Sequence, residues 1–428
     1  MVRDKFKQNY EFIKNNIYLC NSDLNLKGAK YNSALLLGML SAVQNKKTLY
    51  VGEYGLGKTT LAETISGVVN SLPISIIATA SIKGHPELSH EQLIGRPDLG
   101  RLNQGVEKVV WSDFVQVPAK VIDEVNRIPE SKQNVLLSGM QSDTWSFLND
   151  YYISEEGSWF ATANYKDSGN YSIIPPLLDR FDICLESKSP DINISRILRS
   201  AHQSQLDNRN LLAQYKSILN TDDFQTGIDE IKHNFYQIVK QSVGLDLLTQ
   251  DDKLKIQDEI NSIGLKTESN LFFDLLLSEF TSCMHYGHKR STDTCPSGCH
   301  YNTYACNQIS SPASVRTQKA ILSYAKSLAW ISGDKEVGVN HISTVAPYTV
   351  WHKSFLKDSH LNKNNQSKRE EPLALHLSSE LVRDINKRFK QVKSHQEEMI
   401  NYIINKEYSK AESKAKTMDH PVFSQYVK

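Results

Sequence analysis

Several features that would narrow the class of protein are missing from this sequence of 428 residues. The charges nearly cancel, with 49 basic against 48 acidic side chains, so the composition gives no sign of the basic surface that usually binds nucleic acid or anionic lipid. No apolar run approaches the ~18 residues that a membrane-spanning helix needs. The first residues, MVRDKFKQNYEFIKNN, lack the apolar core of a secretory signal. These absences predict a cytoplasmic protein with no membrane contact, for which nucleic acid is an unfavoured partner.

Cysteine is scarce and unevenly placed. Of the six cysteines, Cys20 and Cys184 stand alone, whereas four fall within residues 283–306. Reduced thiols crowded together in a cytoplasmic protein favour a metal site over disulfide bonds.

The apolar patterns divide the chain into four parts. Up to residue 190, short β-rich runs alternate with helical stretches, which predicts an α/β domain with a parallel sheet behind a helical lead-in. Helical periods fill residues 191–356, a polar linker spans 357–372, and 373–428 form a charged helical extension with one apolar stripe. That stripe either packs on the rest of the chain or binds a partner. The runs interpreted as strands are 47–51, 74–78, 120–123, 159–163 and 181–185.

Residues 52–59, GEYGLGKT, match the phosphate-binding pattern GxxxxGK[ST], and they lie between a predicted strand and a predicted helix. Glycines let successive N–H groups curl around phosphate oxygens, and the helix directs its positive end at the same atoms. Lys58 is predicted to neutralise the β- and γ-phosphates, and the Thr59 hydroxyl to bind Mg²⁺. The loop residues predicted to bind ATP are Gly52, Glu53, Tyr54, Gly55, Leu56, Gly57, Lys58, Thr59 and Thr60.

Two acids follow the apolar run at 120–122. Asp123 is predicted to hold Mg²⁺ together with Thr59, and Glu124 to polarise the attacking water as general base. Two acids at a strand end can also be ordinary surface residues, but the phosphate-binding loop favours the catalytic interpretation.

Residues 123–141, DEVNRIPESKQNVLLSGMQ, resemble the MoxR group of AAA+ ATPases. Further segments match that group in order: LIGR at 93–96, FATAN at 160–164, PLLDRF at 176–181 and SVR at 314–316. The resemblance covers roughly residues 20–355. It implies a P-loop AAA+ core, a parallel sheet of strand order 5-1-4-3-2 with flanking helices, followed by an all-α lid. Residues 95–120 match loosely where this clade inserts a β-hairpin, although Trp111 or Phe114 could instead be core residues.

The resemblance also implies roles for particular residues. Asn164 would orient the attacking water, Arg180 would reach the γ-phosphate bound by a neighbouring subunit, and Arg316 would close the lid on the nucleotide. A cation from a neighbour would stabilise the charge of the transition state. Arg180 could instead pair with an adjacent aspartate, Arg316 could be a surface cation, and Arg127 is a rival for the role of arginine finger. The predicted catalytic residues are Lys58, Glu124, Asn164 and Arg180.

The function that the resemblance implies is ATP hydrolysis in a homo-oligomeric, hexameric ring. Relatives in the MoxR group act as chaperones or maturation factors that remodel client proteins or insert cofactors, and they cooperate with proteins carrying a von Willebrand factor A domain. Two alternatives remain. One is a chelatase-like or DNA-directed motor, and the other is an ATP-gated scaffold with little turnover, which would not need a water-activating acid.

A cysteine–histidine segment departs from the usual MoxR lid. Within residues 283–306, cysteines and histidines follow one another at short intervals. Thiolates and imidazoles spaced in this way suit tetrahedral zinc, so a structural zinc site is predicted on four thiolates. An iron–sulfur cluster on the same residues, or thiols without a metal, are the alternatives. The predicted ligands are Cys283, Cys295, Cys299 and Cys306, for one of which His285, His288 or His300 could substitute.

Overall fold

The computed structural model describes residues 2–165, 172–198, 206–221, 223–287, 299–354, 356–357 and 372–427. The chain divides into two compact units, Met1–Glu259 and Ile260–Lys428. The first unit therefore extends beyond the boundary predicted at residue 190. The additional helices stay with it because their side chains bond to the α/β core, as when Lys253 Nζ donates to Asn70 Oδ1 at 3.1 Å.

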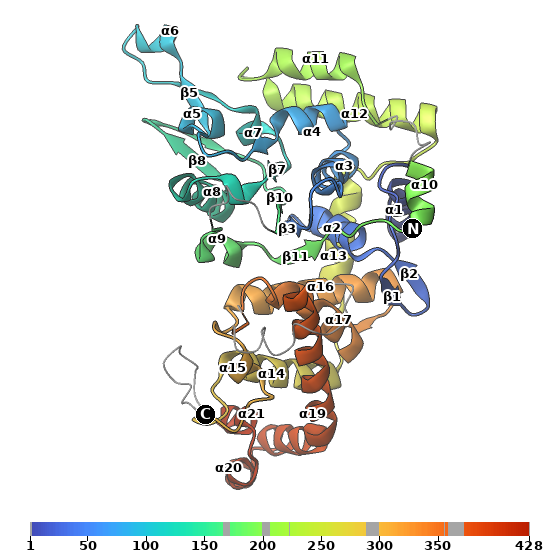
Figure 1. Cartoon of the computed structure of the whole chain (residues 1–428), viewed down its shortest axis with the longest axis vertical. Coiled ribbons are helices and arrows are strands. Elements are labelled where there is room, and N and C mark those ends of the chain that lie inside the picture. The colour runs from blue at the N-terminus through green and yellow to red at the C-terminus, as the bar shows by residue number, and fades with distance from the viewer. Residues whose placement is uncertain are drawn as a thin grey trace. The chain divides into compact units, whose positions relative to one another are not determined.

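A five-stranded parallel sheet forms the centre of the first unit (Figure 1). Its order, β11-β3-β10-β7-β4, confirms the predicted order 5-1-4-3-2. Parallel strands with both faces covered read as continuous apolar runs, and Leu49, Tyr50, Val121 and Phe160 are accordingly buried. The strands are β3 (Lys47–Val51), β4 (Ile82–Lys83), β7 (Lys120–Asp123), β10 (Trp159–Ala163) and β11 (Ile183–Glu186).

One predicted strand was wrong. Residues 74–78 belong to α4 (Ile74–Ala80), and the second strand of the order is the two-residue β4 that follows. A short run rich in β-branched residues cannot be assigned from its pattern alone. Here Pro73 precedes the first helical residue, and Ile76, Ile77 and Ala80 are buried at helical spacing.

Helices before and after β3 cover the sheet. α2 (Ser33–Val43) is buried at every position, and the Asn32 side chain caps it by accepting a hydrogen bond from Leu35 N at 2.9 Å. α2 packs on β3 and β11, whereas α3 (Lys58–Asn70) packs on β7 and β10. The chain before α2 contains α1 (Val2–Asn16) and the small hairpin of β1 (Leu24–Leu26) and β2 (Ala29–Tyr31).

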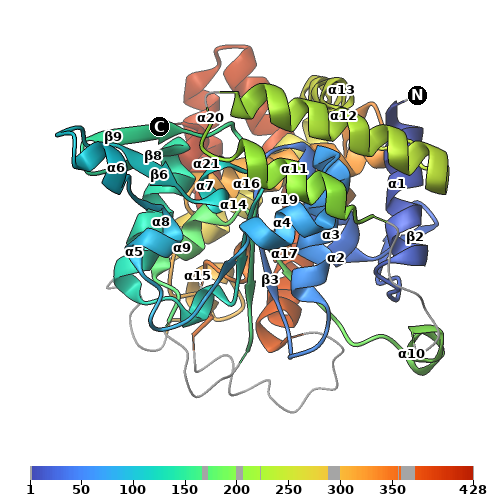
Figure 2. The same ribbon diagram turned by 90° about the horizontal axis from the view of Figure 1, so that it is seen from above.

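Two β-hairpins lie together at one end of the first unit (Figure 2). The first is the hairpin expected within residues 95–120, and the second follows α8. They meet where the rings of Trp111 and Tyr152 lie 5.9 Å apart. Trp111 and Phe114 are both buried. The elements are α5 (His90–Leu93), β5 (Gly95–Pro97), α6 (Leu99–Leu102), β6 (Val109–Trp111), α7 (Asp113–Gln116), η1 (Val125–Arg127), α8 (Glu130–Ser142), β8 (Thr144–Phe147) and β9 (Asp150–Ile153).

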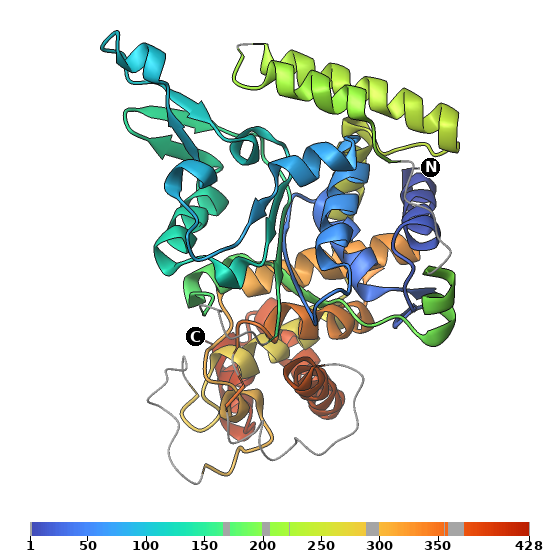
Figure 3. The same cartoon turned by 45° about the horizontal axis from the view of Figure 1, so that its top comes forward.

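Helices that follow β11 complete the first unit. α11 and α12 run side by side as a pair, and α11 contacts α4 (Figure 3). Gln257 of α13 donates to the Val43 carbonyl at 2.7 Å, which ties this helix to the end of α2. The elements are α9 (Pro175–Arg180) before β11, then α10 (Ile192–Leu198), α11 (Arg209–Ile218), α12 (Phe224–Val243) and α13 (Gln250–Ser262).

The second unit is mainly helical. Its long α19 packs on α14 and α17, so Leu381, Ile385 and Phe389 of the apolar stripe are buried within the unit. Arg388 of α19 donates two hydrogen bonds of 2.7 Å to the buried carboxylate of Glu279 in α14. The elements are β12 (Gly264–Leu265), α14 (Thr267–Thr281), α15 (Ala305–Gln308), α16 (Val315–Ser332), β13 (Glu336–Val337), α17 (Val339–Val350), α19 (Leu373–Ile404), α20 (Tyr408–Thr417) and α21 (Pro421–Tyr426).

Candidate nucleotide-binding site

The glycine-rich loop connects the end of β3 to the first residue of α3. Gly57 is the N-cap of α3, with a left-handed backbone at φ 71° and no side chain that caps the helix. The first N–H groups of α3 are therefore directed into the loop, where they suit phosphate oxygens. At Gly52, a Cβ atom would lie 2.7 Å from the Ser187 carbonyl oxygen. Glycine is needed there because the chain following β11 passes so close.

Lys58 is buried at the start of α3, with 7% of its surface exposed. Its ammonium donates to the carbonyl oxygens of Gly52 at 2.9 Å and Glu53 at 2.7 Å, and to Asn164 Oδ1 at 2.8 Å. Burial lowers the pKa of Lys58, while Asp123 and Glu124 oppose that shift. The structure thus brings together the predicted phosphate-binding lysine and the predicted sensor, which are 106 positions apart.

The two residues predicted to bind Mg²⁺ are in contact. The Thr59 hydroxyl donates to Asp123 Oδ1, and the Thr162 hydroxyl donates to the same oxygen at 2.7 Å. A hydroxyl and a carboxylate are hard oxygen ligands of the kind that Mg²⁺ prefers, so this pair fits the ion. Thr162 was not among the predicted residues, although its place on β10 beside Asn164 was a usable signal.

Glu124 follows β7 in a strained, left-handed conformation at φ 52°. Its N–H donates to Thr162 Oγ1 at 2.9 Å. Its carboxylate accepts a hydrogen bond from Asn164 Nδ2 at 2.8 Å and pairs with Arg127 Nη1 at 3.1 Å. The backbone at Glu124 is approached so closely by Gly84 that a Cβ there would lie 2.1 Å from the Glu124 carbonyl oxygen. Gly84 follows β4 and was not among the predicted residues either.

A carboxylate beside this cluster is also perturbed. Burial, and secondly the charge of Asp123, raise the pKa of Glu63 on α3 to about 7.

The glycine-rich loop is supported by hydrogen bonds from the N-terminal part of the chain. Tyr18 donates to Ser187 Oγ at 2.7 Å, and Ser187 Oγ donates to the Leu56 carbonyl at 2.8 Å. This relay holds the loop against the segment that follows β11.

The remaining loop residues lie at the surface. Tyr54 is 52% exposed, and Glu53, Gly55 and Thr60 are exposed as well. They are therefore accessible to a nucleotide approaching the loop.

The two candidate arginine fingers have different surroundings. Arg127 pairs with Glu124 within the site. Arg180, the last residue of α9, donates from Nη2 to Gln141 Oε1 on α8 at 2.7 Å. Arg127 is thus committed to a carboxylate of its own chain, whereas this bond of Arg180 goes to a neutral amide.

The other predicted ligands belong to the second unit. Arg316 is exposed in the first turn of α16, where the Ser314 side chain caps the helix. Cys283 and Cys306 are buried, and the rings of His285 and His300 lie 6.1 Å apart. Cys295 and His288 lie outside the described residues. Among the residues that are described, no three His, Cys, Asp or Glu side chains are grouped to hold a metal ion, so the predicted zinc site gains no support.

Comparisons with known proteins agree with the fold. Residues 47–181 match the model of the AAA domain (dynein-related subfamily). The structure is similar to the crystal structure of a candidate ATPase from Cytophaga hutchinsonii, with a TM-score of 0.61 and 17% sequence identity over 90% of this chain and 94% of that one. A search of the curated proteins finds no match.

Fold and site together define a P-loop nucleotide-binding protein with a parallel α/β core. More narrowly, the domain at residues 47–181 matches the AAA domain found in AAA+ ATPases. In the described ranges, no helix is both long and apolar enough to cross a membrane.

Proposed function

We propose that this chain is an AAA+ ATPase of the MoxR type, which hydrolyses ATP in a homo-oligomeric ring and uses the energy to remodel or mature client proteins. The observation that carries the proposal is the chain of hydrogen bonds from Lys58 through Asn164 to Glu124. Through these bonds the Lys58 ammonium, the Asn164 amide and the Glu124 carboxylate lie in one cluster, following the carboxyl ends of the neighbouring strands β3, β10 and β7.

In this mechanism each residue of the cluster has a separate role. Lys58 and the N–H groups of α3 hold the β- and γ-phosphates. Glu124 takes a proton from the attacking water, and Asn164 orients both that water and the Glu124 carboxylate. Mg²⁺, when bound by Thr59 and Asp123, neutralises charge on the phosphates. The charge that develops on the γ-phosphate would be stabilised by Arg180 from the adjacent subunit.

A mixing experiment tests both hydrolysis and the ring. Glu124→Gln and Arg180→Ala should each lack ATPase activity alone while still binding ATP. Mixed in equal amounts, they should regain about a quarter of the wild-type rate, because an intact Glu124 then meets an intact Arg180 at that share of interfaces. The exposed Arg209→Ala serves as the matched control. Activity of Arg180→Ala alone that does not depend on protein concentration would contradict the shared site.

The two hairpins support a protein client. Their tips expose apolar side chains that a monomeric protein usually buries, including Leu99 at 69% and Tyr151 at 68% exposure. Apolar tips suit unfolded polypeptide better than nucleic acid, whose binding depends on cations. Casein should therefore stimulate hydrolysis, and Leu99→Ser with Tyr151→Ser should remove the stimulation. The control Ile192→Ser, at an equally exposed apolar residue of α10, should leave it intact.

Two further parts of the proposal rest on the MoxR resemblance and the cysteine spacing alone. The resemblance implies a partner with a von Willebrand factor A domain and a nucleotide-dependent role for Arg316. The spacing predicts one structural zinc ion per chain. Metal analysis of the purified protein, compared with Cys306→Ser, checks the zinc site, and a metal content below about 0.1 per chain would remove it.

A further inference from the structure

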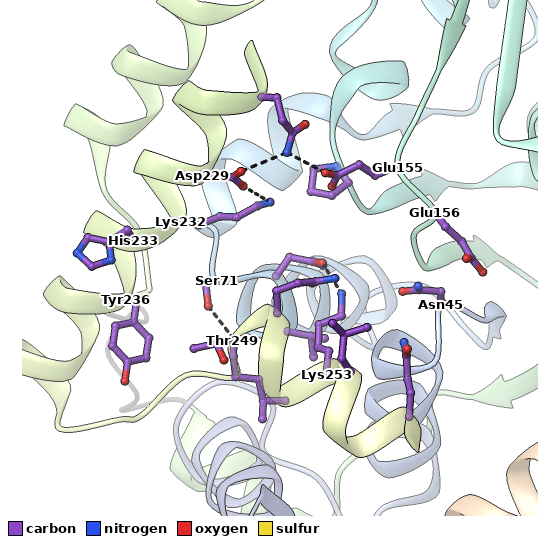
Figure 4. A pocket seen from close by; sticks show the side chains of 18 of the residues that line it. Asn45, Ser71, Glu155, Glu156, Asp229, Lys232, His233, Tyr236, Thr249 and Lys253 are labelled. Atoms are coloured by element: carbon purple, nitrogen blue, oxygen red, sulfur yellow. Dashed lines mark hydrogen bonds and ion pairs between the residues drawn. The ribbon is translucent and has the colours of Figure 1, made fainter. Parts of the chain in front are cut away.

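A cavity of about 830 Å³ lies within the first unit, away from the glycine-rich loop. Three of its walls come from segments that precede β3, β7 and β10, represented by Asn45, Pro118 and Glu155. The others are the end of α3 and the facing sides of α12 and α13 (Figure 4). Its volume is in the range typical of sites for small molecules.

The cavity and the nucleotide site lie at opposite ends of the same strands. β3, β7 and β10 are parallel, and their carboxyl ends lead to Gly52, Glu124 and Asn164. Their amino ends face the cavity, roughly 13–17 Å away along strands of this length. α3 joins the two sites as well, because it begins at Lys58 and ends beside the cavity at Asn70. The nucleotide therefore cannot account for this second site.

Lys253 forms the charged floor of the cavity. It is buried on α13, with 6% of its surface exposed. Its ammonium donates to the neutral Asn70 Oδ1 at 3.1 Å. Within the described residues this oxygen is the one hydrogen-bond acceptor of an ammonium that has three protons to donate, and burying such a group costs free energy. Burial lowers the pKa of Lys253 to about 8, and repulsion from Lys232 adds to this shift.

The charged side chains at the rim of the cavity limit which ligands could bind beside Lys253. Lys232 is already paired with Asp229 at 2.9 Å. Glu155 accepts a hydrogen bond from Gln225 at 2.8 Å, and Glu155 and Glu156 are both exposed. In Figure 4, Glu155 and Asp229 lie across the cavity from Lys253. The rim would repel a multiply charged anion, and the floor would repel a cation. A ligand with one carboxylate and one amino group satisfies both ends.

We propose that this cavity binds a small zwitterionic molecule of the free amino-acid or short-peptide class, with its carboxylate on Lys253 and its ammonium group toward Glu155 and Glu156. The side-chain amides of Gln237 and Gln250 in the lining supply donors and acceptors for a peptide bond. The size of the cavity favours a dipeptide over a single amino acid. This site does not depend on ATP hydrolysis, so its test is independent of the proposed function.

The test is binding of dipeptides to the full chain, measured by ligand-observed nuclear magnetic resonance and by calorimetry. The probes are alanyl-alanine and glycyl-leucine with free ends, together with the twenty amino acids. The same dipeptides, N-acetylated or C-amidated, lack one charge each and should bind at least about tenfold more weakly. Lys253→Gln should weaken binding by a similar factor, whereas Lys255→Gln, at an exposed position on the same helix, should not.

A second variant keeps the test decisive if Lys253→Gln fails to fold. Glu156 is exposed, so Glu156→Gln should fold normally and still weaken binding of the free dipeptides several-fold. The N-acetylated dipeptides should not discriminate between this variant and the wild type. The proposal is overturned if no probe binds at about 10 mM, if capped dipeptides bind as well as free ones, or if neither variant changes the affinity.

Discussion

The two ends of the central sheet treat buried charge differently. At the carboxyl ends, the Lys58 ammonium has three oxygen acceptors, and the Asn164 amide that it contacts also holds Glu124. At the amino ends, the Lys253 ammonium has the neutral Asn70 oxygen as its hydrogen-bond acceptor. The first arrangement orients the groups that we propose to be catalytic. The second leaves a cation uncompensated, which is what a site for an anionic group requires.

The largest expected effect concerns the carboxyl ends. Glu124→Gln keeps the shape of the side chain but removes the general base, so steady-state ATP hydrolysis should fall about 10²–10⁴-fold. The exposed Glu91→Gln is the control. A fall of less than about tenfold would mean that Glu124 does not activate the water. The carboxyl-end site would then differ from the amino-end cavity in its hydrogen bonding but not in catalysis.

A buried charge in the second unit sharpens the comparison, because it is fully compensated. Glu279 is 0% exposed and accepts both hydrogen bonds from Arg388. Arg388→Met leaves this carboxylate without its main partner and should reduce the free energy of unfolding by about 3–5 kcal/mol, measured by urea denaturation. Arg383→Met, at an exposed position of the same helix, should change it by less than about 0.5 kcal/mol.

The pH dependence of stability tests the uncompensated charge at the amino ends. The folded pKa of Lys253 is about 8, against 10.5 ordinarily. Between these values the unfolded chain binds a proton that the folded chain lacks, so the Lys253 contribution to stability rises with pH. Lys253→Met should therefore be stabilising relative to wild type at pH 7, and this advantage should shrink by up to about 2 kcal/mol by pH 10. Lys255→Met should give a flat difference, and a flat difference for Lys253→Met would show that its charge is compensated after all.

The smallest effect concerns a residue that supports the nucleotide site from β10. Thr162→Val keeps the shape of the strand side chain but removes the hydroxyl that contacts Asp123 and the Glu124 N–H. Half-saturation of the ATPase by Mg²⁺ should require roughly tenfold more ion, since hydrogen bonds to charged groups contribute about 1.5–3 kcal/mol. Thr64→Val is the control, because the Thr64 hydroxyl is buried without a hydrogen-bond partner in the described part of the chain. Equal Mg²⁺ dependence of both variants would assign Thr162 to packing alone.

The sequence by itself determined the parts of the protein whose chemistry is local. The pattern GxxxxGK[ST] requires consecutive residues between a strand and a helix, so the predicted roles of Lys58 and Thr59 follow from adjacent residues alone. The continuous apolar runs of β3, β7 and β10 likewise predicted buried parallel strands. The strand order 5-1-4-3-2 came from resemblance to a family, because pairing between distant strands leaves no local pattern.

Only the tertiary structure decided the parts that depend on residues far apart in the chain. The sequence predicted a strand at 74–78 because β-branched residues favour strands. The packing of this segment against α3 and β7 as the helix Ile74–Ala80 depends on the tertiary structure. Gly84 carries no motif, and Thr162 lies in the FATAN segment without a role that the segment indicates. The contacts of both residues follow from the strands that they lie on or follow. The environment of Lys253 could not be read from α13 alone, because its acceptor lies 183 positions away on α3. Burial and charge compensation are properties of the folded surroundings, whereas a phosphate-binding loop is a property of adjacent residues.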